Sequence, residues 1–176
     1  MEEPEVPIEQ VHEDIHRHSH GKGGWATGVA LTTALLAVLA AIASLLAGHY
    51  ANDGVLEQLR ASDTWNQFQA KSVKQSLLVS KIDILEAMGK SGAEKDRLKL
   101  AEYDQEKKEL EHEARRLQHE AEHHMELHSG MAHSVTLFQV AIGISAIAVL
   151  TDRRSFWVAG ILCGVGGLVY AAKTLL

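Results

Sequence analysis

The sequence has few cysteine, proline and aromatic residues, and each of these shortages argues against a class of protein. Among 176 residues there is one cysteine, Cys163, so neither an intramolecular disulfide framework nor a CxxC metal site can form. The two prolines and 5% aromatic residues, against 46% hydrophobic residues, argue against a β-sandwich or barrel and favour long helices. The net charge of −6 argues against a basic nucleic-acid-binding protein, so we expect no nucleic-acid partner.

Charge is also missing from three long stretches, which are residues 23–52, 129–151 and 155–172. As helices these stretches are long enough to cross the ~30 Å hydrocarbon core of a bilayer. The first is too long for a secretory signal peptide and follows an acidic rather than a basic segment. We therefore expect an all-α integral membrane protein in contact with the lipid bilayer.

The expected order along the chain is a tail, three transmembrane helices and one long charged insertion. The segments are a disordered acidic, His-rich tail (1–22), transmembrane helices at 23–50, 129–150 and 155–176, a charged segment (51–128) and a short polar loop (151–154).

The charged segment 51–128 has two nearly equal arms on either side of a Gly-containing turn at 89–92. This predicts an antiparallel helical hairpin, and the alternative is one unbroken rod. Residues spaced by three and four predict a coiled-coil seam in each arm, and the second arm continues in register into the second span. The second-arm seam is Leu100, Tyr103, Lys107, Leu110, Ala114, Leu117, Ala121, His124 and His128, and the first-arm seam is Leu56, Leu59, Ala70, Val73, Leu77, Ile84 and Ala87, interrupted by Asp63 and Asn66.

Small residues line one face of the first and one face of the third span. They predict close helix–helix contacts, because small side chains let two backbones approach in lipid. The pattern leaves open whether the contacts form within a chain or between copies in a homo-oligomer. The residues are Ala30, Ala34, Ala37, Ala41, Ser44 and Gly48 in the first span, and Gly160, Gly164 and Gly167 in the third.

The second span is the most polar, with Ser134, Gln139 and Ser145. A bare amide in hydrocarbon is costly, so Gln139 needs a partner. It either bonds to another helix of the bundle or, with Ser134 and Ser145, lines a pore in a homo-oligomer. No Asp, Glu, Lys or Arg lies inside a span, which counts against a proton relay or an ion-coupled transporter.

Histidines His119, His123, His124 and His128 form two pairs spaced by four residues on the second arm. Each pair shares a helix face and is able to bind a divalent transition metal. The alternatives are a solvated helix surface and a pH-sensitive patch. No catalytic motif is present, so we do not expect an enzyme, and no other cofactor is indicated.

Two stretches carry a family resemblance: WATGVALTTALLAVLAAIASLLAGHYAND and VLEQLRASDTWNQFQAKSVKQSLL. They resemble a bacterial membrane family catalogued as a domain of unknown function, number four-three-three-seven. The resemblance implies a bacterial inner-membrane protein and transfers no activity. It draws attention to Trp65, Gln69, Ala70 and Lys71. Trp65 and Phe68 pack either on the hairpin itself or on a neighbour, and with Gln69 and Lys71 they form a candidate surface for a protein partner or another copy.

The basic residues Arg153 and Arg154 lie in the shortest loop, so the positive-inside rule favours a cytoplasmic tail and a periplasmic hairpin. The function we expect is that of a homo-oligomeric membrane scaffold or accessory protein whose hairpin is an interaction platform. An oligomeric pore lined by the second span is one alternative, and metal binding or sensing through the histidines is another.

Overall fold

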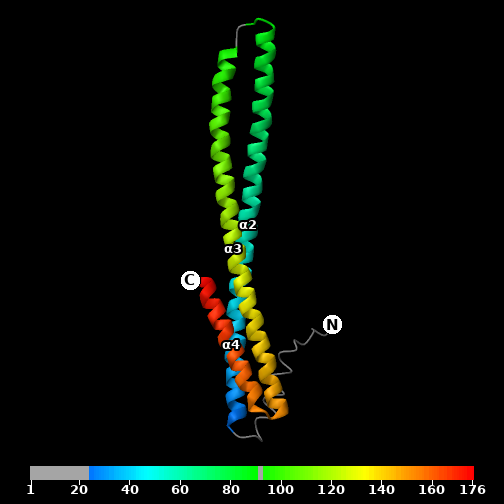
Figure 1. Ribbon diagram of the computed structural model, residues 1–176, viewed down its shortest axis with the longest axis vertical. Helices are drawn as coiled ribbons and strands as arrows, with labels where there is room; N and C mark the ends of the chain where they lie inside the picture. The colour runs from blue at the N-terminus through cyan, green and yellow to red at the C-terminus, as the bar shows by residue number, and fades with distance from the viewer. Residues whose placement is uncertain (1–23, 91–92) are drawn as a thin grey trace, which may run out of the picture. The chain divides into compact units, whose positions relative to one another are not determined.

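The computed structural model describes residues 24–90 and 93–176, and within these ranges the chain forms helices and no strand. The helices are α2 (Trp25–Ala87), α3 (Ala93–Thr151) and α4 (Arg154–Leu175) (Figure 1). The all-helical fold is thereby confirmed, and each helix contains a segment long and apolar enough to cross a membrane. The expected disordered tail, 1–22, lies outside the described residues.

The chain divides into two compact units. Among the described residues, the apolar unit consists of 24–50 and Glu126–Leu176, and the charged unit lies within Ala51–Met125. Helix α3 is continuous through the second arm and the second apolar stretch, as the sequence register predicts.

Both interhelix turns use a residue in the left-handed region of backbone space. Gly89 has a φ of +64°, while the Lys90 N–H donates to the Leu85 carbonyl at 3.0 Å and the Gly89 N–H donates to the Glu86 carbonyl at 3.0 Å. This pair of bonds is a Schellman motif, which satisfies the last carbonyls of α2. Asp152, with a φ of +54°, takes the same place after α3, where the Arg153 N–H donates to the Ala148 carbonyl at 3.2 Å.

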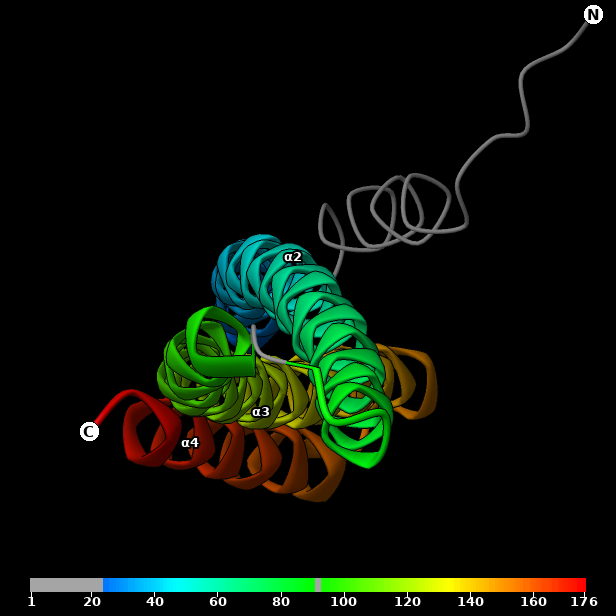
Figure 2. The ribbon, with the colours of Figure 1, turned by 90° about the horizontal axis from the view of Figure 1, so that it is seen from above.

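The core of the apolar unit lies where α2, α3 and α4 meet. Phe138 is 1% exposed and Ala141 is fully buried, and both pack against Leu36, Ala40 and Ala43 of α2. Within this unit α4 lies along α3 (Figures 1 and 2). The Trp157 indole N–H donates to the Thr32 hydroxyl at 3.1 Å, which adds a polar link between α4 and α2.

The glycine face of α4 forms this contact within the chain. A Cβ atom at Gly160 would lie 2.5 Å from the Ser145 hydroxyl oxygen, and one at Gly164 would lie 2.6 Å from a Leu36 methyl carbon. At Gly167 the nearest atom would be Phe138 Cε1, at 2.8 Å. The absence of side chains on α4 therefore makes room for bulky residues of both neighbours.

The predicted small face of α2 does not make the contact within the chain. Its six residues are half-buried or exposed. The buried residues lie to one side of it and are Ala26, Val29, Thr33, Leu36, Ala40, Ala43 and Ala47. The physical reason is that α4 already supplies glycine, so the complementary face of α2 is one that offers a bulky side chain such as Leu36.

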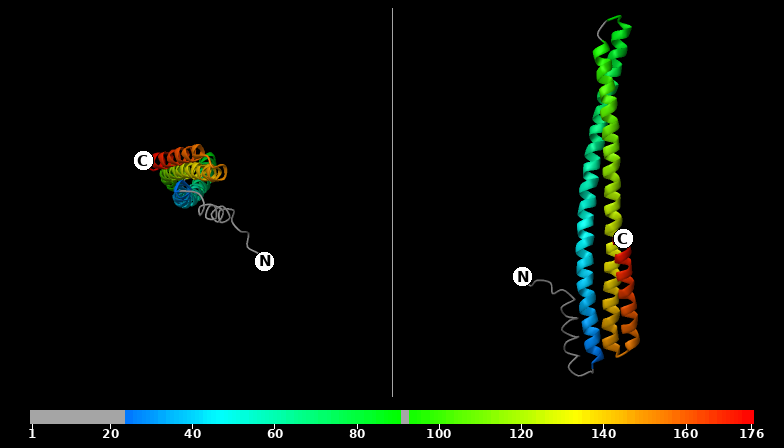
Figure 3. Two further views of the ribbon diagram at one scale, coloured as in Figure 1. Left: turned by 90° about the horizontal axis from the view of Figure 1, so that it is seen from below. Right: turned by 90° about the vertical axis from the view of Figure 1, so that its left-hand side faces the viewer.

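In the charged unit, α2 and α3 lie side by side (Figure 3). The contacts join later residues of α2 to earlier residues of α3: Lys71 bonds to Glu106, and Lys81 lies 2.6 Å from Asp96. The buried apolar residues are Ala61 and Ile82 of α2 and Ala114, Leu117 and Ala121 of α3. Every residue of the predicted second-arm seam is buried or half-buried.

The prediction that the first-arm seam packs against the second arm is wrong, because all residues of that seam are exposed. The face of α2 that meets α3 instead carries Ala61, Trp65, Phe68 and Ile82. Aromatic rings bury more area than Leu or Val, and so this second stripe has the greater gain from packing against α3.

The glycine contact of α4 yields a direct test. We expect Gly160→Leu to lower the unfolding free energy of the chain in detergent by about 1–3 kcal/mol, the usual cost of overpacking. Gly166→Leu is the matched control, because no atom lies within 4 Å of a Cβ built there. Thermal unfolding followed by circular dichroism measures both, and equal midpoints for the two variants would contradict the packing described.

Candidate functional site

The side chains with the densest polar and aromatic contacts lie between α2 and α3 in the charged unit. Trp65 and Phe68 of α2 meet edge to face, with ring centroids 5.4 Å apart and an interplanar angle of 81°. This geometry places the positive edge of one ring against the negative face of the other. Tyr103 is the aromatic residue of the second-arm seam on α3, and it is half-buried.

Cations lie over all three rings. The Lys107 ammonium nitrogen is 5.1 Å from the centroid of Phe68, and the Arg115 guanidinium carbon is 5.9 Å from that of Trp65. Lys71 and Lys99 lie 5.4 and 5.7 Å from the centroid of Tyr103. Such cation–π contacts contribute about 0.5–1 kcal/mol each at exposed sites. Together they form an aromatic–cation band that joins the two helices.

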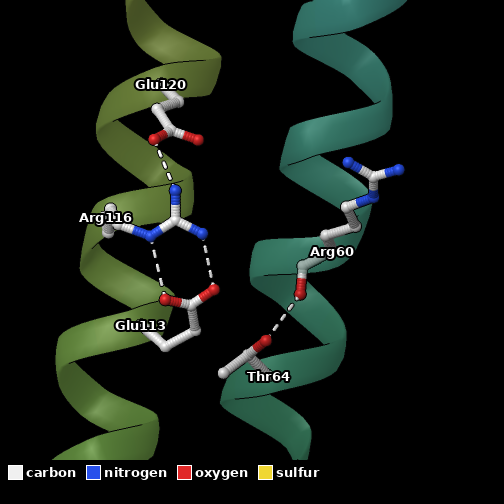
Figure 4. Close-up of polar contacts among 5 residues, drawn as sticks. All are labelled: Arg60, Thr64, Glu113, Arg116 and Glu120. Carbon is white, nitrogen blue, oxygen red and sulfur yellow. Dashed lines mark hydrogen bonds and ion pairs between the residues drawn. The ribbon is translucent and has the colours of Figure 1, made fainter.

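Ion pairs extend the band along the unit. Lys71–Glu106, Lys81–Asp96 and Arg97–Glu86 connect α2 to α3. Within α3, Arg116 binds Glu113 through two nitrogens and Glu120 through a third (Figure 4). Exposed pairs of this kind are individually weak, and of these only the three that join α2 to α3 bear on how the two helices align.

Four of these groups have shifted pKa values. A side-chain hydrogen bond from Lys108 lowers the pKa of Asp104, and one from Arg116 lowers the pKa of Glu113. In return, the hydrogen bond to Glu113 raises the pKa of Arg116, and the bond to Glu86 raises the pKa of Arg97. All four groups are therefore charged at neutral pH, and they act as fixed charges rather than as acids or bases.

The predicted partner surface Trp65, Phe68, Gln69 and Lys71 is not an open aromatic patch. Trp65, Phe68 and Lys71 are half-buried and take part in the band, and only Gln69 is exposed. The sequence left open whether these aromatic residues pack on the hairpin or on a neighbour, and in the structure they pack against the cationic face of α3.

The predicted metal ligands do not converge. Within the described parts of the chain, no three His, Cys, Asp or Glu side chains form a group able to hold a metal ion. His119 and His123 are exposed on α3. His128 turns instead to α2 in the apolar unit, where its Nδ1 lies 2.9 Å from the Ala47 carbonyl oxygen.

The three polar residues proposed to line a pore lie on two different faces of α3. Ser134 is fully buried and Ser145 is 1% exposed, and their hydroxyls donate to the carbonyls of Gly130 and Ala141 at 3.1 and 2.8 Å. Gln139 is exposed. The serines are therefore packed and satisfied inside one chain, and only Gln139 points outward.

One functional surface was assigned to the wrong partner by the sequence argument. The residues of the predicted first-arm seam, which runs from Leu56 to Ala87, are exposed rather than packed inside a hairpin. The signal, a regular three–four spacing, is plain in the sequence, but periodicity defines a face without naming what covers it.

The lowered pKa values predict a pH dependence. A carboxylate whose pKa is lower in the folded state stabilises that state above its unfolded pKa, and the contribution is lost as pH falls through the folded-state pKa. We therefore expect the melting temperature of the full chain in detergent to fall between about pH 5 and about pH 2. Circular dichroism at a series of pH values measures it.

The double variant Asp104→Asn, Glu113→Gln should show a smaller fall than the unmodified chain. Glu102→Gln is the control, since Glu102 is exposed and has no ion pair with a described residue. A double variant with the full acid-induced fall would refute the assignment of these two carboxylates.

Comparison with known proteins gives one match. No curated protein and no solved structure matches the chain. A family model described as "Domain of unknown function (DUF4337)" matches residues 25–176, which covers all three helices. The chain belongs to this family of proteins, the domain of unknown function DUF4337.

Proposed function

We propose that this protein is a homo-oligomeric membrane scaffold, anchored by three transmembrane helices, whose charged unit stands in water as an interaction platform. In this proposal the charged unit is an antiparallel helical hairpin with coiled-coil packing. The opposite order of the contacts along α2 and α3, such as Lys71 with Glu106 and Lys81 with Asp96, supports the hairpin.

The outward faces of the apolar unit support membrane insertion. Leu31, Leu35 and Leu45 of α2 are 72%, 60% and 76% exposed. Side chains of α4 such as Leu162 and Val169 are exposed too. Acyl chains of lipid are the natural surroundings for such a surface, and no Asp, Glu, Lys or Arg lies in the apolar stretches to oppose insertion.

The observation that carries the scaffold proposal lies in the charged unit. There the exposed face of α2 presents apolar side chains to water, among them Leu59, Val73 and Leu77. Soluble surfaces rarely expose contiguous apolar patches of this extent unless something binds to them. The unit therefore has the character of a platform for association.

For the location, we propose a bacterial inner membrane with the charged unit on the periplasmic side. Arg153 and Arg154, between α3 and α4, are exposed and close to the ends of two apolar segments. Positive charge in so short a loop favours the cytoplasmic side.

A pore is the second candidate function, and the outward position of Gln139 favours it. An amide on the outer face of an apolar segment gains from a polar neighbour, which a ring of copies or a water-filled axis would supply. Closure of such a ring needs about four or more copies. The mass of the particle in a lipid nanodisc tests this candidate, because a monomer or dimer leaves no room for a pore.

Water access to single cysteines tests the scaffold proposal, with Cys163→Ala as the background. Ala101 is exposed in the charged unit and Ala41 is exposed in the apolar part of α2. In sealed vesicles we expect a membrane-impermeant maleimide to label Ala101→Cys from one side and to leave Ala41→Cys unlabelled, because hydrocarbon excludes both water and the reagent.

Equal labelling of the two cysteines, or labelling of neither after the vesicles are opened, would contradict the proposal. Release of the chain from membranes by alkaline carbonate would contradict it as well.

A further inference from the structure

The exposed face of α2 in the charged unit carries a heptad spacing that is apolar at seven of its ten positions. We call it the outer seam, and it consists of Leu56, Leu59, Asp63, Asn66, Ala70, Val73, Leu77, Ser80, Ile84 and Ala87. The steps between successive members alternate between three and four residues, and every member is exposed. Its large apolar side chains remain half to two-thirds accessible: Leu59 58%, Val73 60%, Leu77 66% and Ile84 60%.

The outer seam faces away from α3. The residues that α2 buries or half-buries in this unit include Ala61, Phe68, Gln75 and Ile82, which also repeat every seven residues. At 100° per residue each lies roughly 140° around the helix from the seam residue five positions earlier. The two faces of α2 are therefore nearly opposite, and one neighbour cannot cover both.

The length of the outer seam fits a coiled coil. It spans about four and a half heptads, or roughly 48 Å of helix. Three to four heptads are about the minimum at which such a pattern specifies a coiled coil. The exposed leucines of the apolar unit carry no part of this argument, because lipid would cover them.

We propose that the outer seam pairs with the outer seam of a second copy of this chain, in parallel and in register about a two-fold axis. This rests on the proposed membrane function, because two copies inserted in one orientation have their α2 helices running in the same direction. A parallel two-fold pair brings each seam residue opposite its own copy.

The composition of the outer seam suits pairing with itself. Leu56, Leu77 and Ile84 each meet an identical apolar side chain, and Ala70 leaves a layer that two small residues fill. Asn66 meets Asn66, whose amide both donates and accepts a hydrogen bond. Four residues separate Asn66 from Ala70, so Asn66 lies at a d position of the heptad, where the two amides meet only when the copies are in register.

The charges beside the seam permit the same pairing. In a parallel coiled coil each residue on one flank faces the residue five positions later on the other helix. Here Gln69 faces Lys74, Ser76 faces Lys81 and Asp83 faces Met88, so no like charges meet at the flanks.

Asp63 is the one seam residue that meets a like charge, and Arg60 offsets it. The Arg60 guanidinium has no ion pair with a described residue, and Figure 4 shows it on the side of α2 turned away from the Arg116 network. Two-fold symmetry brings the Arg60 of each copy beside the layer formed by the two Asp63 carboxylates. A foreign helix would have to reproduce all of these matches.

Disulfide trapping in native membranes tests the pairing, with Cys163→Ala as the background. We expect Leu77→Cys to form a disulfide-linked dimer on mild oxidation, because facing seam positions bring two Cα atoms within the ~4.4–6.8 Å that a disulfide spans. Val79→Cys is the matched control, since Val79 is also exposed on α2 but lies off the seam. The dimer fraction should be at least about tenfold higher for Leu77→Cys than for Val79→Cys under conditions of partial oxidation.

A second pair of variants covers the case in which cysteine perturbs the seam. Leu77→Lys should shift the particle in nanodiscs from dimer to monomer, because it buries two facing positive charges beside Lys74, and Val79→Lys should not.

The outcomes separate this inference from the function on which it rests. Equal trapping at positions 77 and 79 in a particle that is still oligomeric by mass would overturn the pairing and leave the scaffold standing. A disulfide between Leu77→Cys and a different protein would overturn it in favour of a foreign partner. If Ala101→Cys is not labelled even after the vesicles are opened, the proposed function as a membrane scaffold is refuted instead.

Discussion

A helix that packs against one neighbour can bury only one of its faces, and this limit decides the surface of the charged unit. Helix α2 carries apolar side chains on two nearly opposite faces there. The face with Phe68 and Ile82 meets α3, where four cations lie over the aromatic rings of the unit. The face with Leu77 and Ile84 is left to water. In a unit of two helices, α3 covers one of these faces and nothing in the unit covers the other. The inference drawn above is that another molecule covers the second face.

The apolar unit meets the same limit by a different means. Three helices share one core, and α4 contributes an almost bare backbone at Gly160, Gly164 and Gly167, into which Leu36 and Phe138 project. Its serines Ser134 and Ser145 donate to carbonyls of their own helix, so these two hydroxyls need no hydrogen-bond partner on another helix. What it leaves exposed is largely apolar, which water disfavours and lipid accepts. One physical rule, the covering of apolar faces, therefore implies two different surroundings for the two units.

Much of this could be predicted from the sequence, because helix length, charge-free stretches and glycine spacing act locally. The three apolar segments, the glycine face of α4 and the seam of α3 around Ala114 all follow from periodicity. The identity of each partner does not follow. The spacing of Leu56 to Ala87 marks a face of α2, but the choice between that face and the one with Trp65 depends on the area that the aromatic rings bury. Ser145 and Gln139 are both polar residues of one span, and only the packing of α4 separates a buried hydroxyl from an outward amide. Four histidines likewise lie on one arm, yet in the described part of the chain they belong to no group of three or more metal-ligating side chains.

The central claim is that the free face of α2 is covered by another copy of the chain, and a distance between copies tests it most directly. A spin label attached at position 77 in the Cys163→Ala background, measured by electron paramagnetic resonance in nanodiscs, reports this distance. Packed helices lie about 8–10 Å apart, so the account predicts strong dipolar coupling that disappears when labelled chains are diluted with unlabelled ones. Spectra free of coupling between copies, in particles that contain more than one chain, would contradict it.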